Sequence, residues 1–209
     1  MLGELRCGTE VNARRTEEQR MIHKWIYGAG LAAVTTVRTY YAVNMPQPRQ
    51  SDGDPTEKTL LFLQLLGMQI LPLTYLFSNK LSFADYRMPR LLKAITTVLG
   101  AISFGGAAYL LHRSHADLGS NWRAELQEQP DQTLVTDGIY RVMRHPMYAA
   151  HWLWAIAQAL LLPNWIAGPS FLVTFWPLYR HRVPREEAQM IATFGDDYRA
   201  YAEKVGRLI

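Results

Sequence analysis

Five long apolar runs, separated by polar segments, constrain the fold of this chain more than any other feature. They cover residues 23–43, 59–77, 91–111, 147–162 and 165–179. A bilayer core is about 30 Å thick, and a helix that rises about 1.5 Å per residue needs about 20 apolar residues to cross it. The first three runs meet this length, and the last two, at roughly 24 Å each, are slightly short. The pattern predicts an all-α polytopic membrane protein with about five transmembrane helices.

A soluble helical bundle is the alternative, and the mean hydropathy of −0.11 gives it some support. A helix on the surface of a soluble protein carries a polar stripe at the helical period, whereas residues 60–77 carry none. We therefore expect five spans. The polar residues 1–20 predict a solvated lead-in without a signal peptide, and the single cysteine, Cys7, excludes an intrachain disulfide.

The basic residues predict the orientation of the chain in the membrane. Lys and Arg concentrate in the segments on one side of the five spans, which are residues 44–58, 112–146 and 180–209. The positive-inside rule therefore places these segments and the C-terminus in the cytoplasm, and the N-terminus outside. A net charge of +4 without a basic block argues against a nucleic-acid partner.

The last two runs predict a helical hairpin that turns at residues 163–165. Its arms have matched lengths, so the polar residues before the first arm and after the second lie at the same end. The polar residues that flank the hairpin include Arg144, His145, Arg182, Glu186 and Glu187. Beyond them, residues 184–205 predict an amphipathic helix that begins at Pro184 and is interrupted at Gly195. It would lie against the membrane or over the polar end of the hairpin.

The flanking residues suit the binding of a small charged molecule. Arginine forks bind carboxylates or phosphates, and glutamates bind amines, sulfonium groups or ribose hydroxyls. Two structural interpretations remain open: Arg182 and Glu186 are four residues apart and can pair on one helix, and arginines beside a membrane can simply bind lipid headgroups. The histidines lack metalloprotease spacing, and no glycine-rich loop follows a strand, so neither a metal site nor a dinucleotide site is predicted.

Two segments resemble the signatures of the isoprenylcysteine carboxyl methyltransferase family. The first is GIYRVMRHPMY, residues 138–148, and the second is RVPREE, residues 182–187, followed by FGDDYRAY at residues 194–201. The stretches LGSNW (118–122) and LVTDG (134–138) are also similar to this family. The resemblance covers residues 112–209, and Ala150 departs from it where the pattern usually has glycine.

The resemblance implies an integral membrane enzyme that uses S-adenosyl-L-methionine at the cytosolic end of the last two helices. It implies that Arg144 and Arg182 are catalytic, with Arg144 orienting the acceptor. The residues it implies for cofactor binding are Gly138, Tyr140, His145, Tyr148, Glu186 and Glu187. The acceptor would be lipophilic or lipid-modified, would enter between helices from the membrane lipids, and would most simply be a carboxylate, which needs no base at neutral pH.

Other functions share this architecture. The alternatives are a phospholipid N-methyltransferase, a thiol S-methyltransferase, an NADPH-dependent membrane reductase, and a non-catalytic protein that binds lipid headgroups. Residues 1–111 would form a polar lead-in with three spans, and residues 112–209 the methyltransferase core with the hairpin and the C-terminal helix. The sequence predicts no oligomeric state.

Overall fold

The computed structural model describes residues 2–44, 54–119 and 133–208, with side chains from residue 22 onward. Within these ranges the only β-structure is an isolated bridge between Asp85 and Asn164, so the all-α class is confirmed. The elements in chain order are α1 (Leu2–Asn44), α2 (Pro55–Leu65), η1 (Leu66–Ile70), α3 (Leu71–Phe77), η2 (Ser82–Ala84), α4 (Arg90–Leu118), η4 (Gly138–Arg141), α5 (Pro146–Leu161) and α6 (Ser170–Lys204).

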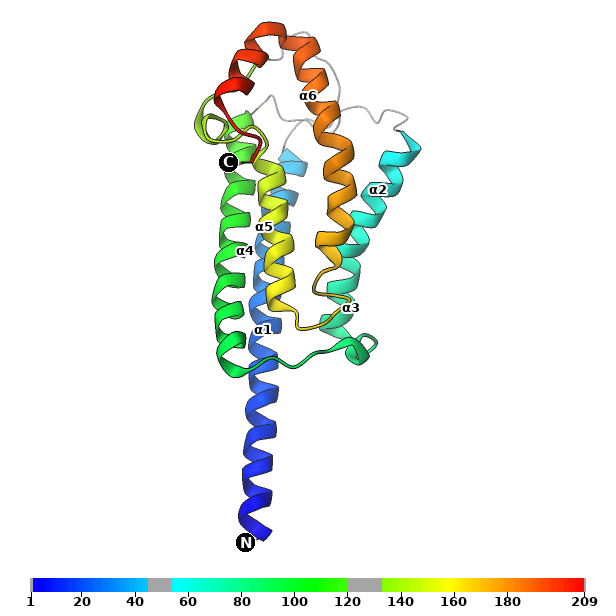
Figure 1. The fold of residues 1–209 in the computed structure, drawn as a ribbon, viewed down its shortest axis with the longest axis vertical. Helices are drawn as coiled ribbons and strands as arrows, with labels where there is room; N and C mark the ends of the chain where they lie inside the picture. Colours follow the sequence, from blue (N-terminus) through cyan, green and yellow to red (C-terminus); the bar gives the residue numbers. More distant parts are fainter. Residues whose placement is uncertain (1, 45–53, 120–132, 209) are drawn as a thin grey trace.

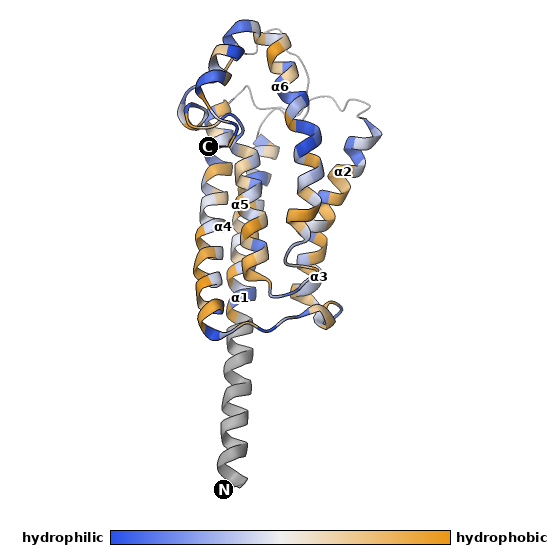
Figure 2. Ribbon diagram, in the orientation of Figure 1, coloured by the Kyte–Doolittle hydropathy of each residue, from blue (hydrophilic) through white to orange (hydrophobic). Residues whose placement is uncertain are grey.

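The long helices run along one common direction, and the two chain ends lie at opposite ends of the molecule (Figure 1). α4 packs mainly on α5 and α1, and α6 packs on α2, η1 and α5. Apolar residues cover the middle of the helices, and hydrophilic residues gather at the end where α6 leaves the bundle (Figure 2). That end carries the polar residues that flank the hairpin.

Two helices begin or continue differently from the sequence expectation. α1 begins at Leu2, so the polar lead-in belongs to this helix. Residues 2–20 contain no proline, and a helix propagates readily once it is formed. α6 does not restart at Pro184 but continues through both Pro177 and Pro184. Val183 and Glu187, on either side of Pro184, are both buried, so this part of α6 is packed against the rest of the molecule. The motif residues 120–122 lie outside the described residues.

A buried polar cluster ties four helical segments together around Gln158 of α5. The Gln158 amide accepts a hydrogen bond from Tyr27 of α1 at 2.8 Å and donates to the carbonyl of Gly67 at 3.0 Å. It also donates to Ser170 of α6. Gly67 lies in the π-helical turn η1, just before Pro72, where its carbonyl also accepts from the Ser170 hydroxyl. A side chain at Gly67 would collide with α6, because an added Cβ would lie 2.6 Å from the Ser170 carbonyl oxygen.

Two helical stretches among the described residues are long and apolar enough to cross a membrane, namely Pro55–Phe77 and Arg90–Leu118. The expected count of five is therefore not confirmed. α5 has 16 residues, α1 carries Lys24 and Arg38 in its apolar part, and α6 becomes polar beyond Tyr179. These three helices are thus shorter or more charged than a simple span.

Candidate functional site at the mouth of the hairpin

The segment before α5 is held by backbone contacts from distant parts of the chain. Gly138 has a φ of +59°, and Asp117 of α4 accepts a hydrogen bond from the Ile139 amide at 2.8 Å. The Arg144 and His145 amides donate to the carbonyls of Gly206 and Arg207, both at 2.9 Å. α5 begins at Pro146, which suits the first turn because proline lacks an amide donor. The C-terminal tail therefore fixes the entry of the chain into α5.

Gly195 allows the tail to reach this position. Its φ of +56° interrupts α6, as the sequence predicted, and the residues beyond it fold back over the ends of α4 and α5 (Figure 1). Tyr201 then donates a hydrogen bond to the carbonyl of Tyr140. The polar end of the hairpin is thus covered by the last turns of the chain.

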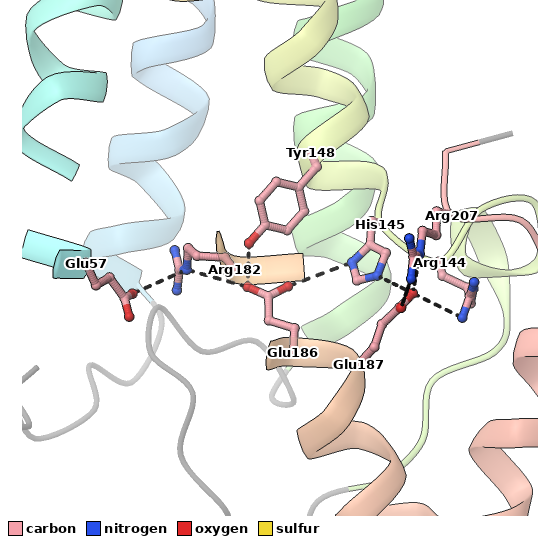
Figure 3. Close-up of polar contacts among 8 residues, drawn as sticks. All are labelled: Glu57, Arg144, His145, Tyr148, Arg182, Glu186, Glu187 and Arg207. Carbon is pink, nitrogen blue, oxygen red and sulfur yellow. Dashed lines mark hydrogen bonds and ion pairs between the residues drawn. The ribbon is translucent and has the colours of Figure 1, made fainter. Parts of the chain in front are cut away.

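Glu187 is the centre of the ion pairs at the mouth. Its carboxylate lies 3.1 Å from Nη1 of Arg144 and 3.2 Å from Nε2 of His145, and it accepts two further donors from Arg207 (Figure 3). The Glu187 side chain is only 12% exposed. Charge-assisted hydrogen bonds of this kind are stronger than neutral ones and hold their partners in one geometry.

Glu186 has a second set of partners on the other side of His145. It accepts a hydrogen bond from the Tyr148 hydroxyl, and its carboxylate lies 3.6 Å from Nε of Arg182 and 3.8 Å from Nδ1 of His145. Arg182 also lies 3.3 Å from Glu57 of α2. Figure 3 shows the continuous row of side chains that results. We call it the hairpin network, and its members are Glu57, Arg144, His145, Tyr148, Arg182, Glu186, Glu187 and Arg207.

The pKa values of the two adjacent glutamates are shifted in opposite directions. Burial raises the pKa of Glu186, and the nearby Arg182 charge only partly opposes this effect. Burial also acts to raise the pKa of Glu187, but the hydrogen bond from Arg207 and the charge of Arg144 outweigh it and lower the pKa. Glu187 is therefore a firmly ionised anchor, whereas Glu186 is the carboxylate whose charge is more readily lost.

His145 is neutral at pH 7. Burial lowers its pKa, and the hydrogen bond with Glu187 only partly offsets this effect. Because Glu187 is an ionised acceptor, Nε2 of His145 carries the proton and donates it to that carboxylate. Nδ1 then faces Glu186 with its lone pair.

The structure brings six of the eight sequence-predicted site residues into the hairpin network, and these six are Arg144, His145, Tyr148, Arg182, Glu186 and Glu187. It places the other two beside α4. An added Cβ at Gly138 would lie 2.4 Å from Asp117, and the buried Tyr140 donates to the carbonyl of Ser114 at 3.2 Å. In this structure both shape the segment before α5.

Sequence reasoning missed Glu57 and Arg207. Glu57 is in the first turn of α2, and Arg207 follows the end of α6, so neither belongs to the segments that flank the hairpin. Both reach the network through contacts between elements distant in sequence. No group of three or more histidine, cysteine, aspartate or glutamate side chains in the described ranges could hold a metal ion.

The fold and the site define a helical protein with a charged site at one end of a hairpin of apolar helices. Residues 100–192 match the model of the isoprenylcysteine carboxyl methyltransferase family. The resemblance found in the motifs is therefore confirmed for this segment, which contains all six converging residues.

Individual relatives agree with this match. The protein-S-isoprenylcysteine O-methyltransferase of Schizosaccharomyces pombe is 33% identical over 112 residues, covering 53% of this chain and 47% of its own length. The human protein of the same name is 37% identical over 89 residues, covering 42% and 31%. The chain thus spans less than half the length of these curated relatives. A solved structure of the eukaryotic intramembrane Ras methyltransferase aligns with a TM-score of 0.47 and 23% identity, covering 88% of this chain and 61% of that one.

Proposed function

We propose that this protein transfers a methyl group from S-adenosyl-L-methionine to the carboxylate of a lipophilic, isoprenylcysteine-like acceptor. The observation that carries the proposal is the convergence of the two motif segments. Six motif residues, from residues 144–148 and 182–187, meet in one network although the hairpin separates them in sequence. The relatives over this segment are named protein-S-isoprenylcysteine O-methyltransferases, which supports this reaction class.

The residues present fit the cofactor. Its amino-acid end carries one carboxylate and one ammonium group, and the hairpin network offers three guanidinium groups and three carboxylates. The buried Nε of Arg144 has no hydrogen-bond partner in the described part of the chain, so a donor stands ready for an incoming oxygen. His145, Tyr148, Glu186 and Glu187 would hold the cofactor, and Gly138 and Tyr140 would act by shaping the adjoining segment.

Arg144 and Arg182 are assigned to contact the reacting groups. S-adenosyl-L-methionine, when bound, supplies an electrophilic methyl group on a sulfonium. A carboxylate acceptor is already ionised at neutral pH, so the protein removes no proton from it. The task of the side chains is to align the acceptor and exclude water. Because no proton has to be removed, His145 is assigned a binding role rather than that of a base.

We further propose that the protein is integral to a membrane, with about five spans and with the hairpin network on the cytoplasmic side. The division at residue 112 falls inside α4, and residues 112–209 would carry most of the cofactor site. The termini lie at opposite ends of the molecule (Figure 1). Topology reporters fused at residue 209 and ahead of residue 20 should therefore report opposite sides, and a shared side would contradict the odd number of spans.

The direct test uses purified protein in lipid nanodiscs with methyl-labelled S-adenosyl-L-methionine. The label should pass to N-acetyl-S-farnesylcysteine, and N-acetylcysteine without the farnesyl group should remain unlabelled. Label in extracted phospholipid or in a small thiol instead would change the acceptor class. Binding of NADPH in place of S-adenosyl-L-methionine would favour a reductase, and binding of neither would favour a lipid-binding protein.

A further inference from the structure

Arg38 is a charged residue within an apolar helix that the hairpin network does not use. It lies on α1, six residues before the helix ends at Asn44, within the apolar run 23–43. Ionisable side chains inside a membrane-spanning segment are costly and usually mark functional sites. The Arg38 side chain is exposed. No carboxylate oxygen of the described residues lies within ion-pair distance of it.

The single side-chain partner of Arg38 in the described part of the chain is His151 of α5. Nδ1 of His151 lies 2.7 Å from the Met147 carbonyl oxygen, to which it must donate. Nε2 is then the ring nitrogen that accepts, and it lies 3.2 Å from Nη1 of Arg38. An arginine has five N–H donors, so this contact leaves most of the guanidinium fork unused.

The Arg38–His151 pair lies directly beside the hairpin network. His151 is three residues after Tyr148, so the two side chains project from the same face of α5, with His151 deeper by about 4.5 Å. Both rings stack on Phe175 of α6, with centroid separations of 5.4 Å for His151 and 6.2 Å for Tyr148. Arg182 of the network is close enough to interact electrostatically with both Arg38 and His151.

The direction of the Arg38 side chain argues against a simple lipid anchor. An arginine that binds headgroups extends along its helix toward the nearer membrane surface. The guanidinium of Arg38 is instead bonded across to α5, next to the aromatic wall formed by Tyr148, His151 and Phe175. This position is on the membrane side of the proposed cofactor site, where a lipophilic acceptor would arrive.

We propose that Arg38, held by His151, binds the carboxylate of the lipophilic acceptor. This inference rests on the proposed function and names the group that recognises the acceptor. In the hairpin network each of the three guanidinium groups lies within ion-pair distance of at least one carboxylate, and Arg144 is paired with Glu187. Among the described residues, Arg38 is the guanidinium beside the network without a carboxylate partner, and an incoming carboxylate supplies the missing negative charge.

The test compares N-acetyl-S-farnesylcysteine with its methyl ester, which has the same lipid chain but no charge. Binding is followed by tryptophan fluorescence of the purified full chain in detergent micelles, without cofactor. Wild-type protein should bind the acid about ten- to a hundred-fold more tightly than the ester, the range expected for one charged hydrogen-bonded contact. The acid and the ester partition differently into micelles, so the acid-to-ester affinity ratio is compared between wild-type and variant proteins in the same micelles, where this difference cancels.

Arg38→Gln should abolish this preference for the acid, raise the KM for the acid more than it lowers kcat, and leave S-adenosyl-L-methionine affinity unchanged. Arg38→Lys should restore part of the preference, because lysine keeps the charge but not the fork. The matched control is Arg180→Gln. Arg180 is also exposed on a long helix, but it lies over the Trp176 ring. This control should keep the full preference.

The outcomes separate the two proposals. If wild-type protein methylates the acid while Arg38→Gln keeps the acid preference, the Arg38 site is wrong and the methyltransferase stands. If wild-type protein binds the acid through Arg38 but never methylates it, the anion site stands and the proposed function is wrong. Equal loss in Arg38→Gln and Arg180→Gln would show that general positive charge, and not the Arg38 site, produces the preference, which overturns the Arg38 proposal. Absence of both binding and methylation overturns both proposals.

Discussion

The hairpin network and the Arg38–His151 pair differ in their charge balance. In the network every arginine lies within ion-pair distance of a glutamate, whereas Arg38 bonds only to a histidine among the described residues. A balanced network keeps its shape without a ligand and can exchange partners with a zwitterion such as the amino-acid end of S-adenosyl-L-methionine. An unbalanced cation selects an anion. Under the two proposals above, two neighbouring sites for different ligands are distinguished by their net charge.

The largest effect should come from removing the centre of the network. Glu187→Gln leaves the buried guanidinium of Arg144 without its carboxylate, which costs about 3 kcal/mol, the lower end for a broken buried pair, because Arg207 is half-exposed and can be resolvated. We expect the Tm in detergent to fall by roughly 10 °C and cofactor affinity to fall with it. The exposed Glu203→Gln should change neither. An unchanged Tm in Glu187→Gln would mean that the network does not hold the tail.

The next largest effect is expected from Arg144→Lys. Lysine keeps the charge opposite Glu187 but loses the planar fork. The substitution should therefore reduce the alignment of the reacting groups more than the stability of the fold. The single-turnover rate should fall about a hundred-fold, with near-normal Tm and cofactor affinity. Arg141→Lys, three residues earlier and exposed, is the control. A parallel loss of affinity and rate would assign Arg144 to the cofactor, and full activity would remove it from catalysis.

Gly195→Ala should disturb the network while sparing the Arg38–His151 pair. An added Cβ would meet nothing within 4 Å, so the cost is the backbone strain at a φ of +56°, about 1–3 kcal/mol. Cofactor affinity should fall because the tail then holds Arg207 less firmly beside Glu187. The preference for the acid over the ester should persist. Gly105→Ala, in α4 with equally open space, should be neutral or slightly stabilising. Loss of the acid preference in Gly195→Ala would show that the two regions are coupled.

The smallest effects concern pH, and they distinguish the two glutamates. The raised pKa of Glu186 stabilises the fold below its ordinary value of 4.5, and this contribution is lost as pH rises through the raised pKa. The lowered pKa of Glu187 stabilises the fold above 4.5, and this contribution is lost as pH falls through the lowered pKa. Acidification from pH 7 should therefore first raise the Tm and then lower it. Glu186→Gln should remove the rise alone; a rise that survives would place the titrating group elsewhere.

The sequence predicted the parts of the site that local patterns encode. Arms of matched length placed Arg144 and His145 beside Glu186 and Glu187, and Gly195 marked the break in α6. Arg38 was visible as a charge within an apolar run. Its partner His151 lies 113 positions further along the chain, and no periodic pattern in the sequence indicates that contact.

Contacts between distant elements could not be predicted. Glu57 reaches Arg182 because α2 packs on α6, and Arg207 reaches Glu187 because the tail folds back after Gly195. The continuity of α6 through Pro184 could not be predicted either. Proline by itself favours the start of a new helix, whereas in the structure this part of α6 is packed and stays helical.

The chemical nature of the labelled product tests the central claim most directly. Purified protein is incubated with methyl-labelled S-adenosyl-L-methionine and N-acetyl-S-farnesylcysteine, and the extracted product is treated with base. A carboxyl methyl ester hydrolyses in base and releases its label as volatile methanol, whereas methyl groups on nitrogen or sulfur remain attached. The account predicts that essentially all of the transferred label becomes volatile and that the pre-formed methyl ester accepts none. Base-stable label, or equal labelling of the ester, would contradict it.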